Sequence, residues 1–157
     1  AKPAGIDAPV FAVSAMASGN DLQRLQIIKG WSEQGESFEK VFDIAGDSGS
    51  HASVNLDTCE PRGRGYRSLC KVWSDPDFKE DQNAFYYARV VENPSCRWHV
   101  YQCLAAQISC DGTGNKKVPE GLESCCSDEF PKTIQERAWR SPIWYNPITP
   151  LAGRRSN

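Results

Sequence analysis

The stretch that most constrains the fold of this chain reads Phe-Tyr-Tyr-Ala-Arg-Val-Val, at residues 85–91. It consists almost entirely of aromatic and β-branched residues, a composition typical of a β-strand. Alternation places Phe85, Tyr87, Arg89 and Val91 on one face and Tyr86, Ala88 and Val90 on the other. Because both faces carry bulky side chains, the stretch predicts a central strand. Asn93-Pro94 ends it, since proline cannot donate a hydrogen bond to a strand ladder.

Other apolar or alternating stretches predict further strands, at residues 10–17, 22–31, 38–44, 68–73 and 133–145. The first is a short apolar run, which favours a buried strand. The second and third flank a short loop that contains Gly35, a pattern that predicts an antiparallel hairpin. Pro142 divides the last stretch, so we expect two short strand pieces or a bent edge strand there.

Residues 46–67 are rich in Gly, Ser, Asp and Arg and predict a long surface loop. Ser95 is a candidate cap for a helix over about residues 96–107. A chain of 157 residues is long enough for one domain with its own core. We therefore predict a single, mainly β domain over 1–157: an antiparallel β-sandwich-like fold with one short helix, long disulfide-tied loops, and irregular segments at 1–9 and 146–157.

The seven cysteines are numerous for this length and are typical of an oxidising compartment, either outside the cell or in the periplasm. They are Cys59, Cys70, Cys96, Cys103, Cys110, Cys125 and Cys126. Three disulfides would leave one thiol, either free or paired outside the chain. Because Cys59 and Cys70 flank the second half of the long loop, a local bridge between them is one expectation.

The net charge of −2 gives no overall field that would favour nucleic acid or an anionic membrane. No apolar run approaches the length of a membrane span. The first residues lack the apolar segment of a signal peptide, and the chain does not begin with methionine. These features favour a processed or excised segment of a longer protein.

The sequence offers several weak candidates for a chemical site. Cys96, His99, Cys103 and Cys110 could bind zinc, but their spacing is irregular and disulfides are the better interpretation. A cysteine nucleophile would need His51 or His99, and no feature of the sequence orients either one. Calcium could bind the carboxylates of Asp75, Asp77 and Asp81, although a turn with solvated carboxylates explains this pattern better.

Two further groups of residues are candidates for binding. Arg62, Arg64 and Arg67 alternate with glycines on the long loop and could contact an anion or a carboxylate of a partner. The tryptophans at 73, 98, 139 and 144 could line a sugar site, although in a strand-rich domain such residues more often lie in the core or at an interface. No catalytic motif is present, so we assign no catalytic, cofactor-binding or metal-binding residue to this chain.

Three segments resemble a known family. They are Leu25-Gln-Ile-Ile-Lys-Gly-Trp31 with Glu39-Lys-Val-Phe-Asp43, then Trp73-Ser-Asp-Pro-Asp-Phe78 with Ala84–Trp98, and finally Thr133–Tyr145. In this order, over about residues 5–147, they are similar to the C-terminal region of the bacterial domain of unknown function 3604. That family in turn resembles the polymerase-and-histidinol-phosphatase (PHP) superfamily of metal-dependent hydrolases.

The resemblance implies an exported protein in which the metal-binding His and Asp motifs lie in an N-terminal catalytic part. None of those motifs is present here, so a divalent metal is expected only in that other part. The chain is then a non-catalytic accessory domain or cleaved fragment, and its expected partner is the catalytic part. The alternatives are a self-standing secreted binding module or self-assembling homo-oligomer, and a zinc-stabilised domain.

Overall fold

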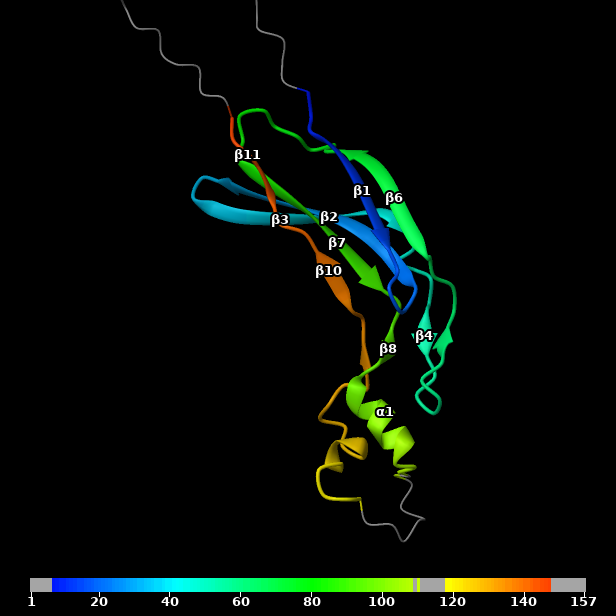
Figure 1. Ribbon diagram of the computed structural model, residues 1–157. Coiled ribbons are helices and arrows are strands. Elements are labelled where there is room, and N and C mark those ends of the chain that lie inside the picture. Colours follow the sequence, from blue (N-terminus) through cyan, green and yellow to red (C-terminus); the bar gives the residue numbers. More distant parts are fainter. Residues whose placement is uncertain (1–6, 109, 111–117, 148–157) are drawn as a thin grey trace, which may run out of the picture.

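The computed structural model describes residues 7–108, 110 and 118–147, and this part of the chain is mainly β (Figure 1). Its strands are β1 (Val10–Met16), β2 (Leu22–Glu33), β3 (Glu36–Gly46), β4 (Ser53–Val54), β5 (Pro61–Arg62), β6 (Ser68–Ser74), β7 (Ala84–Glu92), β8 (Ser95–Cys96), β9 (Thr133–Ile134), β10 (Arg137–Trp139) and β11 (Ile143–Tyr145). One α-helix, α1 (Trp98–Ala105), and a 3₁₀ turn, η1 (Glu123–Cys125), complete the described elements.

The largest sheet is antiparallel and has the order β10–β7–β2–β3, with β11 also paired to β7. Strand β7 is central, as predicted, because it pairs with β2 along one side and with β10 and β11 along the other. The predicted hairpin of β2 and β3 is confirmed. Its turn is Gln34-Gly35, and both residues have positive φ, as the tightest hairpin turns require.

Strands β1 and β6 form a two-stranded ribbon that packs against one face of the large sheet (Figure 1). Apolar side chains from both layers form the core, with fully buried members in Leu22, Leu25, Ile27, Ile44, Leu69, Ala84 and Tyr86. The predicted antiparallel, sandwich-like architecture is therefore confirmed. The expectation of a buried strand at 10–17 is half wrong, because every second residue of β1 faces outward and is exposed.

A buried ion pair lies among the apolar core residues. The Nζ atom of Lys29 is 2.5 Å from Oδ2 of Asp75, and these residues are 2% and 3% exposed. Tyr86 donates a hydrogen bond to the same carboxylate oxygen, at 2.7 Å. The lysine interrupts the apolar face of β2 because a carboxylate from the turn after β6 reaches into the core to meet it.

The described residues between β8 and β9 form a narrow end of the molecule around α1 (Figure 1). The predicted helix over 96–107 is confirmed in kind, but it begins at Trp98 after Arg97, not after Ser95. Ser95 instead belongs to β8, which pairs with β9. As predicted, Pro142 separates two short strands, β10 and β11.

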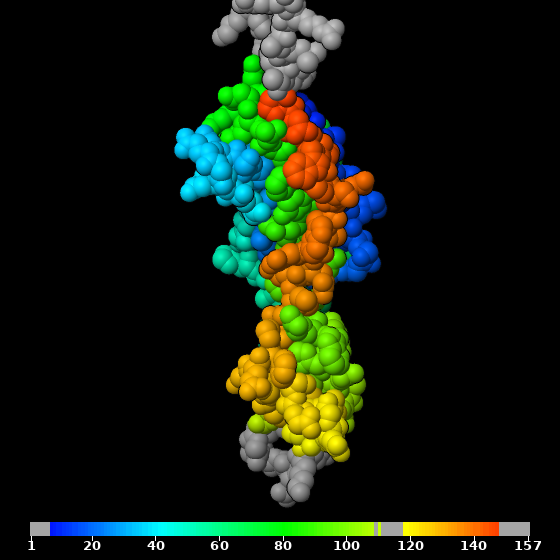
Figure 2. All heavy atoms as spheres, turned by 90° about the vertical axis from the view of Figure 1, so that its left-hand side faces the viewer, coloured from blue at the N-terminus to red at the C-terminus, as the bar shows by residue number. Residues whose placement is uncertain are grey.

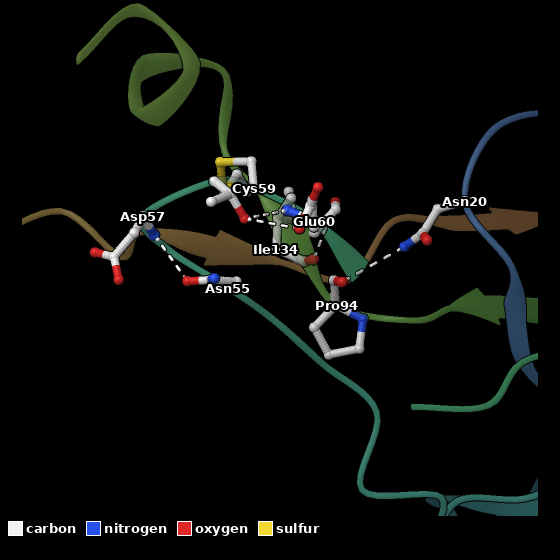
Figure 3. The surroundings of a disulfide bond; sticks show 10 residues. Asn20, Asn55, Asp57, Cys59, Glu60, Pro94 and Ile134 are labelled. Atoms are coloured by element: carbon white, nitrogen blue, oxygen red, sulfur yellow. Dashed lines mark hydrogen bonds between the residues drawn. A yellow bond between two sulfur atoms is a disulfide. The ribbon is translucent and has the colours of Figure 1, made fainter. Parts of the chain in front are cut away.

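Three disulfides stabilise this end, in agreement with the expected number. They join Cys59 to Cys96, Cys103 to Cys125 and Cys110 to Cys126. The expected bridge between Cys59 and Cys70 is wrong. Cys59 instead ties the β4–β5 hairpin to β8 (Figure 3). Nearby, Asn20 donates a hydrogen bond to the carbonyl of Asn93, which holds the turn before β2 against the same segment.

Candidate functional site

The face of the large sheet that points away from β1 and β6 carries exposed aromatic side chains. Phe85 and Tyr87 lie on this face of β7, and their rings are nearly parallel, with centroids 6.4 Å apart. Trp144 of β11 is the direct partner of Phe85, with ring centroids 5.2 Å apart. Trp139 of β10 is the partner of Arg89. We call Phe85, Tyr87, Trp139 and Trp144 the aromatic face.

The two tryptophans of the aromatic face are open to solvent, whereas Phe85 and Tyr87 are half-buried. Trp139 is 67% exposed and Trp144 is 66% exposed. Figure 2 shows β10 and β11, in orange and red, lying across the front of the molecule beside β7 in green. Tryptophan has the largest apolar surface of any side chain, so two such residues left open on one sheet indicate a binding face.

Glycine at position 30 allows the rings to lie close to the sheet. Gly30 is the cross-strand partner of Phe85, and a Cβ atom at this position would come within 2.2 Å of the phenylalanine ring. The ring therefore lies directly over the glycine. Two hollows meet at Phe85: one of about 420 Å³ also contacts Trp139, and one of about 520 Å³ also contacts Trp144.

Arginines lie among these rings. Arg89, Arg137 and Arg140 all line the hollow that contains Trp139. Arg89 donates from Nε to Oε1 of Gln26 at 2.8 Å, which fixes its guanidinium on the sheet. The carboxylates on the same face lie farther across, on β3. Asp43 pairs with Arg24 at 3.5 Å, and Glu39 lines the hollow beside Trp144. The half of the face over β7 and β10 is therefore positively charged.

The outward side of the β1–β6 ribbon has the opposite character. Its exposed side chains are small or apolar, and none is charged: Val10, Ala12, Ser14 and Met16 from β1, and Ser68, Cys70, Val72 and Ser74 from β6. Lys71 is the one charged residue of the two strands, and alternation places it on the other side. We call this surface the uncharged face.

The uncharged face contains the free cysteine and ends at an open strand edge. Cys70 is exposed, makes no disulfide and lies opposite Ser14. Within the described residues, β1 pairs only with β6, so its other edge offers unpaired backbone groups. Exposed edge strands usually carry charges, prolines or bulges that block further pairing, and β1 has none of these.

The zinc candidates do not form a site with free thiolates, because Cys96, Cys103 and Cys110 are all in disulfides. His99 is buried in α1, and its Nε2 has no hydrogen-bond partner in the described part of the chain. His51 is exposed in the long loop. Six of the seven cysteines are oxidised, which leaves Cys70 as the reduced thiol.

Of the three aspartates in the turn at 75–81, Asp77 and Asp81 are exposed, as a solvated turn predicts, and Asp75 is buried. Asp75 is buried against Lys29 and Tyr86, so the expectation of a solvated carboxylate is wrong at this position. Asp77 pairs with Lys40 at 2.5 Å, and hydrogen bonding to that lysine lowers the pKa of the Asp77 carboxyl. Asp75 and Asp77 therefore form ion pairs with Lys29 of β2 and Lys40 of β3.

The three arginines of the long loop, Arg62, Arg64 and Arg67, lie in different surroundings. Arg67 donates to the carbonyl of Gly19 and to Oδ1 of Asp21, both at 3.3 Å, and so ties the loop to the turn before β2. Arg62 lies in the short strand β5, and Arg64 follows it as an exposed residue. Sequence reasoning chose these residues over Arg89, Arg137 and Arg140. The alternation of 85–91 already placed Arg89 beside Phe85 and Tyr87, but only the pairing of β10 and β11 with β7 adds the tryptophans.

The geometry defines a disulfide-stabilised, antiparallel β-sandwich-like protein with two unusual exposed faces. The family model "Protein of unknown function (DUF3604)" matches residues 2–147, and the chain belongs to this family. No curated protein and no solved structure matches it. The three disulfides indicate an oxidising, extracellular-type compartment. No helix in the described residues is long and apolar enough to cross a membrane.

Proposed function

We propose that this chain is a non-catalytic accessory domain of a secreted or periplasmic protein, and that its uncharged face packs on a catalytic part of the same protein. The resemblance to the PHP superfamily supports a metal-dependent hydrolase as that part, and any divalent metal would be bound there. The observation that carries the proposal is the absence of charge from the exposed side of β1 and β6.

Charge distribution supports packing at this face. Buried centres of protein interfaces are depleted in charged residues, and permanent interfaces are more apolar than transient ones. About a quarter of the residues in this chain are charged, yet the eight outward positions of the ribbon carry none. Small residues at Ala12, Ser14 and Cys70 make the surface flat, so a second folded part can approach closely.

The free thiol of Cys70 also supports packing of a partner on the uncharged face. An exposed free cysteine in an oxidising compartment is open to oxidation and to mixed disulfides. Cys70 lies near the middle of the uncharged face, where a packed partner would shield its sulfur. Packing thus accounts both for the missing charge and for an exposed cysteine that makes no disulfide in this chain.

The test divides the natural protein that carries this chain into two polypeptides, this chain and the remainder, which are produced together. We expect them to co-elute in size-exclusion chromatography. Val72→Lys should abolish co-elution, because it places a charge in the middle of the interface. Val41→Lys is the matched control, since Val41 is exposed on β3 of the other layer. Wild-type polypeptides that elute separately would contradict the proposal.

Self-association is the second candidate, and the unpaired edge of β1 favours it. Two copies could pair through β1, because the strand has no charge that would repel its own copy. Sedimentation velocity of this chain alone should then show a dimer whose fraction rises with concentration and falls in Ala12→Lys, which places a charge on the strand that would pair. A monomer at all concentrations would exclude this candidate.

A further inference from the structure

We propose that the aromatic face binds a linear acidic polysaccharide, one that carries carboxylate or sulfate groups. This face lies on the side of the large sheet opposite the β1–β6 ribbon, so it stays open when the uncharged face is covered. The inference goes beyond the proposed accessory role and does not depend on it.

The rings supply stacking surfaces for sugars. The C–H faces of pyranose rings are apolar and flat, and they pack on exposed aromatic rings, whereas the hydroxyl groups at the ring edges stay in water. Trp139 and Trp144 are exposed enough to receive a sugar ring, and Phe85 between the two hollows continues the aromatic surface.

The spacing of the tryptophans fits a polymer better than a single sugar. Their partners on β7 are Arg89 and Phe85, which are four residues apart. At about 3.4 Å per residue, the two tryptophans are separated by about 14 Å along the sheet, the span of about two to three sugar units. A linear chain that lies along β7 could stack on both.

The arginines give the charge preference. Arg89, Arg137 and Arg140 share one hollow with Trp139, and no acidic residue lines it. Guanidinium groups bind carboxylates and sulfates through paired N–H donors. The hydrogen bond from Arg89 to Gln26 orients the guanidinium group of Arg89 on the sheet before a ligand binds. The nearest acidic side chains of this face, Asp43 and Glu39, belong to β3, and Asp43 is paired with Arg24.

Other polymers fit the face less well. A nucleic acid is recognised mainly through many phosphate contacts, and this chain has a net charge of −2 with only three arginines around the hollow. Tryptophan and arginine are also enriched at protein interfaces, but here the two tryptophans are far apart along an open sheet and the arginines gather beside Trp139, which suits an extended charged chain. Stacking combined with a few cations is typical of recognition of acidic sugars.

The test is affinity electrophoresis of the chain in gels that contain polygalacturonate, carrageenan or neutral amylose. We expect retardation by polygalacturonate, carrageenan or both, which also identifies the preferred anion, and little by amylose. Trp139→Ala with Trp144→Ala should weaken binding about tenfold or more. Trp98→Ala is the matched control, since Trp98 is 70% exposed on α1, away from this face, and its loss should leave binding unchanged.

Arg137→Ala with Arg140→Ala should weaken binding to the acidic polymers and reduce its dependence on salt. No retardation by either acidic polymer would overturn the proposal. So would equal binding by the variant lacking Trp139 and Trp144, because contact would then be unspecific ion exchange, and so would amylose binding that the arginine changes do not affect. Co-elution through the uncharged face is a separate measurement, so failure of one proposal leaves the other standing.

Discussion

Lys29 is the residue at which a simple apolar pattern fails. Its position in the core face of β2 puts a cation directly across from Lys40, the cross-strand partner on β3. Like charges in this arrangement are destabilising unless they are neutralised. Asp75 and Asp77 neutralise them, one inside the core and one at its edge. The same burial and the hydrogen bond to Asp75 raise the pKa of the Tyr86 hydroxyl, so Tyr86 remains a proton donor to the carboxylate.

Lys29→Met should lower the free energy of unfolding by about 3–5 kcal/mol, because Asp75 is left buried and charged without its partner. Urea denaturation under non-reducing conditions measures this change. Adding Asp75→Asn should recover part of the loss, since it removes the buried charge. Lys40→Met is the control. Its ion pair is exposed, so the cost should stay below about 1 kcal/mol. Equal losses of unfolding free energy in Lys29→Met and Lys40→Met would show that Lys29 is not the buried ion-pair partner of Asp75.

Glu92 has a raised pKa, caused first by burial and then by repulsion from Glu136. A carboxyl group whose pKa is raised in the folded state stabilises the fold below its ordinary pKa of 4.5, and this contribution is lost as pH rises through the folded-state value. Glu92→Gln should therefore raise the melting temperature at pH 7 and change it little below pH 4.5. Differential scanning calorimetry over this range measures the effect.

Glu123 provides the comparison, because the pKa of its carboxyl is shifted in the opposite direction to that of Glu92. Hydrogen bonds from its own backbone N–H and from Gly121 lower the pKa of this carboxyl. Glu123→Gln should lower the melting temperature at pH 7, where the charged group is favoured in the folded state. A Glu92→Gln protein that is less stable at pH 7 than the parent would contradict the account of Glu92.

At the scale of elements, composition and period-two alternation were sufficient to locate the long strands. The β2–β3 hairpin follows from alternation on both sides of Gly35, and β7 follows from its run of aromatic and β-branched residues. Segments whose structure depends on distant partners could not be located this way. The short strands β4, β5, β8 and β9 have only two residues each, too few to show an alternation. Strands β4 and β5 form a local hairpin, whereas β8 pairs with β9, which lies far along the sequence.

Disulfide connectivity shows the same limit. Nearness in sequence favoured Cys59 with Cys70, but β6 carries Cys70 outward into the uncharged face. Cys59 and Cys96 are 37 residues apart and meet because the β4–β5 hairpin lies beside β8. The sequence named Trp139 and Trp144 as candidates for a sugar site, together with Trp73 and Trp98. It could not group the first two with Phe85 and Tyr87, because they reach β7 only through the pairing of the last two strands.

The bridge between Cys59 and Cys96 should contribute strongly to stability. Closing a loop of this length in the unfolded chain corresponds to about 4 kcal/mol in the chain-entropy description. Changing both cysteines to alanine should therefore lower the urea midpoint markedly. Cys70→Ala is the control, because a free exposed thiol closes no loop. Similar midpoints for the two variants would contradict the assigned pairing.

At the scale of the whole molecule, the two layers of the sandwich present two different surfaces. The β1–β6 ribbon offers a flat, uncharged face, and the large sheet offers aromatic rings with arginines. Because these surfaces are on opposite sides of the core, the molecule can pack on a neighbour with one and present the other to a ligand. This arrangement suits an accessory domain that holds a polymer near a catalytic part.

The most direct test of the accessory role measures alkylation of Cys70 in the native, unreduced state by intact mass. In this chain alone the exposed thiol should take up one label rapidly. In the natural protein that carries the chain, the account predicts that Cys70 stays unlabelled until the protein is unfolded, because the catalytic part covers it. Equally rapid labelling in both proteins would show that the uncharged face is open to solvent and would contradict the central claim.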